Sequence, residues 1–369
     1  MPAVLDLPGP AALVDLDRLE RNIRRMSDLA DRNGVRLRPH VKTHKSVEIA
    51  RLQFGGETGP VTVSTLSEAE HFAQAGFQDI TYAVPLDPAM LDRAAALAER
   101  IDSLNLLIDH PDLLEAMERR GGRPLRCFLK VDCGYHRAGV DPDSTTALDL
   151  ARRIAASSAT GFEGILTHAG HAYRCRNRTE TLEVAGEERD AMVRFAGKLL
   201  EAGIPVPEIS IGSTPTLSAV DHLCGVTEIR PGNYVFFDRF QAAIGSCEPA
   251  DIAFSVLGSV IGVYPDRSEF LINTGAMALS RDPGADHLDP GFGFGEVFDP
   301  EQGERPALGI VTSLSQEHAV VRADGATPTL GARVRVTPNH SCLTAGLFDR
   351  YYAVRGTRVE GSMFPCRGW

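Results

Sequence analysis

A dense basic octet, RPHVKTHK at residues 38–45, contains the residue best suited to covalent catalysis. A lysine amine attacks carbonyl groups, or forms a Schiff base with them, when burial and neighbouring charge lower its pKa. The other basic side chains of the octet supply such charge around Lys42 and offer sites for anions. A solvated basic loop is the alternative interpretation, because most lysines are exposed. The octet predicts a catalytic Lys42 if the fold places it at the end of a strand.

A second pair of side chains, His340 and Cys342 in PNHSCLT, has the chemistry of a metal site. Residues two apart point to the same face where the chain is extended, so we expect the two side chains to lie together. An imidazole and a thiolate suit Zn²⁺, and two protein ligands leave positions for water or substrate, as catalytic sites require. A buried apolar thiol at Cys342 is the alternative.

Two segments rich in glycine and hydroxyl groups, IGSTPT (211–216) and RPGNYVFFD (230–238), follow late apolar runs. Backbone N–H groups at glycine turns and short hydroxyls hold phosphate in barrel enzymes. Ordinary loop punctuation is the alternative interpretation for both segments. Two more segments, 133–139 and 167–173, also follow apolar runs. They are predicted to bring three further polar side chains to the mouth of a barrel, namely Arg137, His168 and Tyr173.

The elements that must position these side chains alternate along the first two-thirds of the chain. Short apolar runs, each followed by a turn and in most cases a helical stretch, lie at 35–42, 61–65, 79–84, 103–109, 124–132, 161–168, 207–213 and 226–237. Continuous apolar strands between amphipathic helices predict a parallel sheet covered by helices, and eight such units favour a closed (β/α)8 barrel. Active sites of this fold lie at the carboxyl ends of the strands, where Lys42 falls. Ser67 and Glu70 have the spacing of a helix capping box.

After about residue 245 the pattern changes to short β-branched runs separated by Gly, Pro and Asp turns. This pattern is typical of antiparallel strands. The segment AALVDLDRL (11–19) predicts one more strand leading into a helix. We therefore expect a barrel domain over residues 18–245 and an antiparallel β domain formed by 1–17 and 246–369.

Composition and charge exclude several classes of protein. The 369 residues are 43% hydrophobic and carry a net charge of −11, and no run of Lys and Arg stands out, which argues against nucleic acid or an anionic membrane as partner. No apolar stretch approaches the ~20 residues of a membrane span, and the N-terminal segment lacks the pattern of a secretory signal. The seven cysteines are scattered, so we expect reduced thiols and a cytoplasmic protein.

Taken together, these motifs resemble the fold-type III pyridoxal-phosphate enzymes, in the family of eukaryotic-type D-serine dehydratase, D-threo-3-hydroxyaspartate dehydratase and D-threonine aldolase. The resemblance runs from PAALVDLDRLERNI to the terminal RGW. It implies a barrel of alanine-racemase type followed by a β domain, in a homodimer. It also implies pyridoxal 5'-phosphate bound by Lys42 of the RPHxKxxK motif, and a divalent metal, Zn²⁺ or alternatively Mn²⁺, held by His340 and Cys342.

The resemblance also assigns roles around the cofactor. Arg137 in HRAG would lie near its phenolic oxygen and Tyr173 beside its pyridine nitrogen, while His40 and His168 would line its site. The loops that hold its phosphate would be formed by Gly212, Ser213, Thr214, Gly232, Asn233 and Tyr234. One departure from the family is Asn273, where relatives more often carry aspartate.

The His-x-Cys pair and the GSTPT loop are features of the dehydratases of this family, whereas the better-known aldolases carry His-x-Asp. The resemblance thus implies a dehydratase that converts a β-hydroxy-D-amino acid, such as D-serine, D-threonine or D-threo-3-hydroxyaspartate, to a 2-oxo acid and ammonia. The alternative is a D-threonine aldolase, which yields glycine and an aldehyde. Racemase chemistry and a non-enzymatic pyridoxal-phosphate-binding protein are two further alternatives.

Overall fold

The computed structural model describes residues 3–300 and 307–369, and these divide into two compact units. The β unit holds the described residues up to Arg25, together with Thr43–Ile49 and Asn233–Pro365. The barrel unit holds Met26–Lys42, Ala50–Gly232 and Cys366–Trp369. The division falls within helix α1 (Leu16–Asn33) and again within α2 (Val47–Leu52).

Eight parallel strands form the sheet of the barrel unit: β2 (Arg36–Leu37), β3 (Val61–Val63), β4 (Asp79–Pro85), β5 (Ser103–Ile108), β6 (Leu125–Lys130), β7 (Thr160–Leu166), β8 (Glu208–Ile211) and β9 (Glu228–Ile229). Their order is β2-β9-β8-β7-β6-β5-β4-β3. The ring closes just after β2, where Thr62 donates its N–H to the carbonyl of Pro39 and pairs in parallel with His40. The predicted closed barrel is confirmed, and each strand lies within or beside its predicted apolar run.

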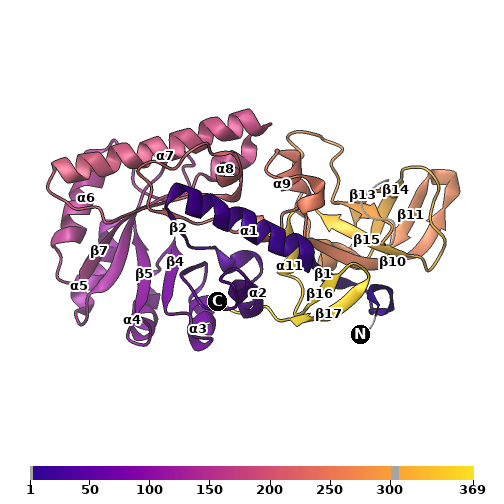
Figure 1. Cartoon of the computed structure of the whole chain (residues 1–369), viewed down its shortest axis with the longest axis horizontal. Coiled ribbons are helices and arrows are strands. Elements are labelled where there is room, and N and C mark those ends of the chain that lie inside the picture. Colours follow the sequence, from indigo (N-terminus) through magenta and orange to yellow (C-terminus); the bar gives the residue numbers. More distant parts are fainter. Residues whose placement is uncertain (1–2, 301–306) are drawn as a thin grey trace. The chain divides into compact units, whose positions relative to one another are not determined.

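Helices cover the outside of this barrel, as Figure 1 shows. They are α3 (Leu66–Gln74), α4 (Leu91–Ala98), α5 (Pro111–Arg120), α6 (Thr145–Ala156), α7 (Arg178–Glu201) and α8 (Thr214–Ala219). Every residue of β5 is buried because helices cover one face of the strand and the barrel interior covers the other. Leu107, Phe128 and Leu166 pack together from neighbouring strands.

The start of helix α3 differs from the sequence prediction. Its N-cap is Thr65, whose hydroxyl accepts the N–H of Glu68, and the carboxylate of Glu68 accepts the N–H of Ser64 at 2.8 Å. The capping box predicted at Ser67 and Glu70 is therefore wrong. Both side chains already lie inside the helix, where they bind Arg93 instead.

The β unit is a nine-stranded sheet ordered β11-β14-β13-β12-β15-β10-β1-β16-β17, with β11 also paired to β10. The strands are β1 (Ala11–Asp15), β10 (Phe254–Tyr264), β11 (Glu269–Ile272), β12 (Gly295–Phe298), β13 (Gly309–Leu314), β14 (Ala319–Ala323), β15 (Arg333–Pro338), β16 (Tyr351–Arg355) and β17 (Arg358–Met363). The predicted antiparallel pairing is confirmed except between β1 and β16, which are parallel. No hairpin joins these two strands, since the whole barrel lies between them in sequence, so no turn imposes an antiparallel direction.

The remaining helices are short. They are α9 (Arg239–Ala243), α10 (Ala276–Leu279) and α11 (Ser341–Ala345), with 3₁₀ turns η1 (Val4–Asp6), η2 (Val41–Thr43), η3 (Pro88–Met90), η4 (Gly170–Arg174), η5 (Asn233–Val235), η6 (Pro249–Asp251) and η7 (Pro265–Arg267). In the part of the chain that the structure describes, none of the helices combines the length and the apolar character needed to cross a membrane.

Candidate active site

A cavity of about 510 Å³ opens at the carboxyl ends of the barrel strands. It is lined by His40, Lys42, Ser64, Ala83, Val84, Pro85, Lys130, Arg137, Ala138, Leu166, His168, Gly212 and Arg230, all at or just beyond strand ends. The lining includes five residues that the sequence analysis proposed: His40, Lys42, Arg137, His168 and Gly212. Among the described residues that line this cavity, every charged side chain is basic and none is a carboxylate. The cavity is therefore suited to an anionic ligand.

Lys42 reaches this cavity from the 3₁₀ turn η2, which begins directly after the strand-closing residue His40. The backbone N–H of Lys42 lies 3.5 Å from Nδ1 of His40. Burial, followed by the charge of Lys42, lowers the pKa of both His40 and His168 well below the ordinary value. Both imidazoles are neutral at physiological pH and add no positive charge beside the lysine.

Two cations of the cavity were not singled out from the sequence. Lys130, the last residue of β6, is buried, and this burial with the charge of Arg230 lowers the pKa of its amine to about 7. Arg230 follows β9 and donates to the hydroxyl of Ser210 and the carbonyl of Thr167. Burial lowers its pKa only to about 10, so it stays charged at neutral pH. A basic residue at the end of an apolar run is the signal that could have identified both.

The first predicted phosphate loop lies beside the cavity. Gly212 has a φ of +115°, and a Cβ there would come within 2.7 Å of the Leu217 side chain, so the turn requires glycine. Ser213 is the N-cap of α8 and exchanges capping hydrogen bonds with Thr216. Thr214 is the first residue of that helix and is buried.

The second predicted phosphate loop divides between the two units, since Gly232 ends a segment of the barrel unit and Asn233 begins a segment of the β unit. Asn233 and Tyr234 lie in η5 and are both buried. The amide of Asn233 donates to Asp238 at 2.8 Å and to the Cys342 sulfur at 3.4 Å. Tyr173 lies in η4, half-buried, and is not one of the residues assigned to the cavity wall in the described chain.

His340 and Cys342 lie together in the β unit, although the local backbone is not the extended strand that we expected. His340 is the N-cap of α11 and Cys342 is the second residue of that helix. Burial opposes protonation of His340, but hydrogen bonds with Asp282 and Cys342 raise its pKa to about 11. Burial likewise favours the neutral thiol of Cys342, yet contact with His340 brings its net pKa below the ordinary value. Each of the two side chains thus favours the charged form of the other.

Asp282 orients this pair, and the sequence analysis missed it. Nδ1 of His340 donates to Oδ2 of Asp282 at 3.0 Å, so Nε2 is the ring nitrogen left to act as a ligand. Carboxylates that fix a histidine in this way are typical partners of metal-binding imidazoles. Thr43, which follows Lys42 in sequence, places its hydroxyl 3.3 Å from the Cys342 sulfur.

The donor chemistry of both places fits the groups that the sequence predicts. The cavity offers an amine and several cations to an anionic aldehyde cofactor. The imidazole of His340 and the sulfur of Cys342 offer two ligands to a borderline-soft divalent ion. In residues 3–300 and 307–369, no group of three or more His, Cys, Asp or Glu side chains forms a further metal cluster.

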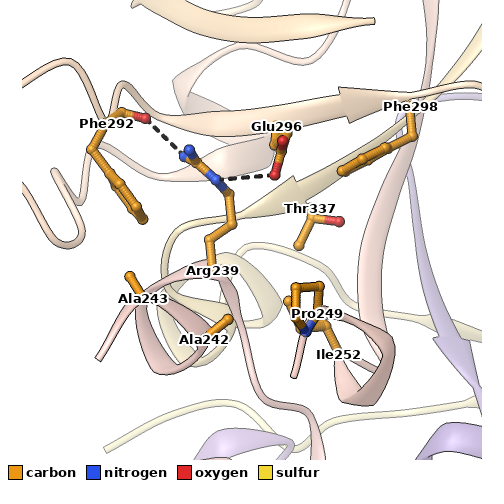
Figure 2. A pocket seen from close by; sticks show the side chains of 9 residues that line it. All are labelled: Arg239, Ala242, Ala243, Pro249, Ile252, Phe292, Glu296, Phe298 and Thr337. Carbon is orange, nitrogen blue, oxygen red and sulfur yellow. Dashed lines mark hydrogen bonds and ion pairs between the residues drawn. The ribbon is translucent and has the colours of Figure 1, made fainter. Parts of the chain in front are cut away.

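A second cavity, of about 260 Å³, lies in the β unit and holds none of the predicted site residues. Figure 2 shows Arg239 pointing between Phe292 and Glu296, with Phe298 and Ile252 among the apolar walls. The guanidinium stacks 3.9 Å above the ring of Phe292, donates to the carbonyl of the same residue at 2.8 Å and lies 3.5 Å from the Glu296 carboxylate. The protein itself thus supplies both a hydrogen-bond acceptor and a negative charge for the guanidinium of Arg239.

Two successive segments of the chain match known protein families. Residues 14–239 match the family model described as the alanine racemase N-terminal domain, and residues 253–354 match that of a putative serine dehydratase domain. D-threo-3-hydroxyaspartate dehydratase of Delftia sp. is 40% identical over 377 residues, covering 99% of both chains. Its solved structure matches over 100% of both chains with a TM-score of 0.94. A cysteine-to-alanine variant of that enzyme is described as the metal-free form.

Two other relatives are named for two different reactions, one a dehydration and the other an aldol cleavage. D-serine dehydratase of Dictyostelium discoideum is 35% identical, with 99% of this chain and 98% of the relative covered. D-threonine aldolase of Arthrobacter sp. is 32% identical, with 95% of this chain and 90% of the relative covered. The similarity therefore covers 90% or more of two relatives named dehydratases and of one named an aldolase.

Proposed function

Because the chain belongs to the pyridoxal-phosphate-dependent family that contains the D-serine dehydratases, D-threo-3-hydroxyaspartate dehydratase and D-threonine aldolase, we propose that it is a dehydratase of β-hydroxy-D-amino acids. Its substrate would be D-serine, D-threonine or D-threo-3-hydroxyaspartate, and its products a 2-oxo acid and ammonia. The observation that carries the proposal is Lys42 in a basic strand-end cavity, in a chain that also pairs His340 with Cys342.

The cavity residues would bind the cofactor and the substrate. Lys42 would hold pyridoxal 5'-phosphate, which supplies an electron sink for the electrons of the broken Cα–H bond. Arg137 and Arg230 would neutralise the negative charges of cofactor and substrate, as the resemblance assigns for Arg137. We retain the predicted phosphate loops, Gly212 to Thr214 and Gly232 to Tyr234, and the predicted place of Tyr173 as part of this proposal.

Proton transfer would depend on Lys42. Its amine lies in the same cavity as the neutral imidazoles of His40 and His168 and the amine of Lys130, and Lys42 is the group that the resemblance places at the cofactor. A lysine in this place could take the Cα proton, which in an elimination leaves with the β-hydroxyl group as water.

His340 and Cys342 would hold the divalent metal, for which the thiolate favours Zn²⁺ over Mn²⁺. Such an ion would supply a Lewis acid for the departure of the β-hydroxyl group, which is a poor leaving group. Asp282 would keep Nδ1 of His340 protonated, so that Nε2 is the ligating nitrogen.

The aldolase reaction is the second candidate, because an aldolase is among the full-length relatives. The same residues would then assist removal of the β-hydroxyl proton and cleavage of the Cα–Cβ bond. We also propose that the protein acts in the cytoplasm as a homodimer on small molecules alone.

A product assay tests these proposals. Purified protein loaded with pyridoxal phosphate and Zn²⁺ is incubated with each of the three D-amino acids, with and without EDTA, and Lys42→Ala serves as the inactive control. Formation of 2-oxo acid and ammonia that EDTA abolishes supports the dehydratase. Glycine and an aldehyde would instead identify the aldolase, and absence of any product from all three substrates would refute both.

A further inference from the structure

Helix α7 carries a buried carboxylate, Glu188, to which no role has yet been given. The side chain of Glu188 is fully buried. It occupies the same face of the helix as Ala185, Met192 and Phe195, where an apolar residue would be expected. A buried carboxylate is costly unless its oxygens are hydrogen-bonded and its charge is balanced, so its surroundings must compensate it.

The compensation comes from the loops that line the cavity. One carboxylate oxygen of Glu188 accepts the N–H of Ala169 at 3.0 Å and the N–H of Gly212 at 3.1 Å. Ala169 follows the cavity residue His168, and Nδ1 of His168 lies 3.4 Å from the carbonyl oxygen of Gly212. Glu188, Gly212 and the pair His168–Ala169 therefore form a closed ring of contacts behind two strand ends.

This ring has two consequences for the site. A carbonyl oxygen only accepts hydrogen bonds, so its contact with His168 favours the tautomer with the proton on Nδ1. The N–H of Gly212 is already bound to Glu188, so the phosphate of a cofactor would depend on other donors in this loop. Gly212 would act through its shape, which lets the backbone approach without a side chain.

The second carboxylate oxygen of Glu188 has no hydrogen-bond partner among the described residues. The carboxylate acts electrostatically on Lys130 and Arg230, two cations of the cavity wall. Burial is the largest influence on the pKa of Lys130 and lowers it. The charges of Arg230 and Arg137 lower this pKa as well, whereas Cys133 and Glu188 raise it. Glu188 thus places a negative charge behind a cavity wall that is otherwise basic.

We propose that Glu188 is a positioning residue of the active site, which fixes the loops after β7 and β8 and balances the positive charge of the cavity. The inference rests on the proposed function in one respect, that the cavity holds pyridoxal phosphate. It predicts that the two roles separate on mutation: the hydrogen bonds need only an acceptor oxygen, whereas the charge balance needs a carboxylate.

Three variants separate these roles. Glu188→Gln keeps an oxygen that can accept both N–H groups but removes the charge, and Glu188→Ala removes both. Glu187→Gln makes the same chemical change at the exposed neighbouring position and is the matched control. Each variant is prepared free of cofactor, checked for folding by circular dichroism, and titrated with pyridoxal phosphate by absorbance between pH 6 and 9.

We expect Glu188→Ala to bind the cofactor at least about tenfold more weakly, because two buried N–H groups lose their acceptor. Glu188→Gln should stay within about threefold of the wild type near neutral pH. As the pH is raised, however, the affinity of Glu188→Gln for pyridoxal phosphate should begin to decline at a lower pH than that of the wild type. The reason is that Lys130 loses its proton at a lower pH without the neighbouring negative charge. Glu187→Gln should match the wild type throughout.

Wild-type affinity in a folded Glu188→Ala variant would overturn the proposal. If that variant does not fold, Glu188→Gln decides, and an unchanged pH profile would equally overturn it. Wild-type protein that binds pyridoxal phosphate but forms no 2-oxo acid would refute the proposed reaction instead, while the binding comparison at Glu188 stands.

Discussion

Replacing Asp282 by asparagine is expected to weaken Zn²⁺ binding while leaving both proposed metal ligands in place. In the wild type the Asp282 carboxylate accepts the Nδ1 proton of His340 at 3.0 Å and also accepts the N–H of Gly284 at 2.7 Å. Asparagine keeps the shape and one acceptor oxygen, so the backbone contact can persist. What is lost is the negative charge that makes the imidazole a better donor to the metal.

The size of the loss follows from this contact. Removing a carboxylate partner of a metal-bound histidine typically costs 10–100-fold in affinity, or about 1.4–2.7 kcal/mol. The Asp282 side chain is about a quarter exposed (24%), so solvent screens part of its charge. We therefore expect the lower half of that range, about 10–30-fold.

Competition with a chromogenic chelator at fixed pH measures the Zn²⁺ affinity directly, without reference to turnover. Asp286→Asn is the control, since Asp286 is exposed and lies only four residues away. Equal affinity of the wild type and Asp282→Asn would refute the proposed orientation of His340 by Asp282. An equal loss in Asp286→Asn would show that general loop charge, rather than this hydrogen bond, is responsible.

Three further predictions concern the cofactor, the barrel and pH. Lys42→Ala should lose the absorbance of tightly bound pyridoxal phosphate and about 10²–10⁴-fold of turnover, and retention of both after gel filtration would exclude Lys42 as the anchoring residue. Arg38→Ala should lower the free energy of unfolding in urea by about 3–5 kcal/mol, because it removes the guanidinium that lies 2.6 Å from the fully buried Glu228 carboxylate. Removal of the exposed ion pair between Arg152 and Asp149 should cost less than about 1 kcal/mol. The two cavity histidines have lowered pKa values, so the unfolded chain takes up protons below about pH 6.5 that the folded chain does not. The Tm should fall as the pH drops from 6.5 to 5.5, where proton uptake at these two histidines outweighs the opposite contribution of His340, whose pKa is raised in the folded chain, and a constant Tm would contradict this account.

The strands of the barrel could be predicted because burial on both faces requires runs of apolar residues, and these stand out against the turns between them. The parallel pair β1–β16 could not be predicted in the same way. Pairing direction depends on how distant segments meet, and residues 11–19 contain no information on their partner. The cap of α3 was misplaced because Thr65 and Ser67 both offer a hydroxyl at suitable spacing.

The sequence predicted Lys42 and His168 at strand ends, and the structure places both in the strand-end cavity, while their roles stay predictions. Asp282 and Glu188 were missed because single acidic residues are common, and only the fold reveals that each is aimed at another site residue. Glu188 did leave a trace in the sequence, since it interrupts the apolar face of helix α7. Lys130 could have been found by the rule that identified Lys42.

The place of strand β1 has a consequence for how the chain is synthesised. Ala12 pairs with Val256 and with Tyr351, so strand β1 leaves the ribosome well before the two strands that flank it. At bacterial and eukaryotic translation rates, residues 11–15 would wait roughly 20–70 s for β16 to emerge. During that interval nearly all of the barrel unit has already been translated, while an apolar strand edge remains unpaired. Nascent chains that stall before residue 351 should therefore expose this edge to chaperones or to other chains, whatever the state of the barrel.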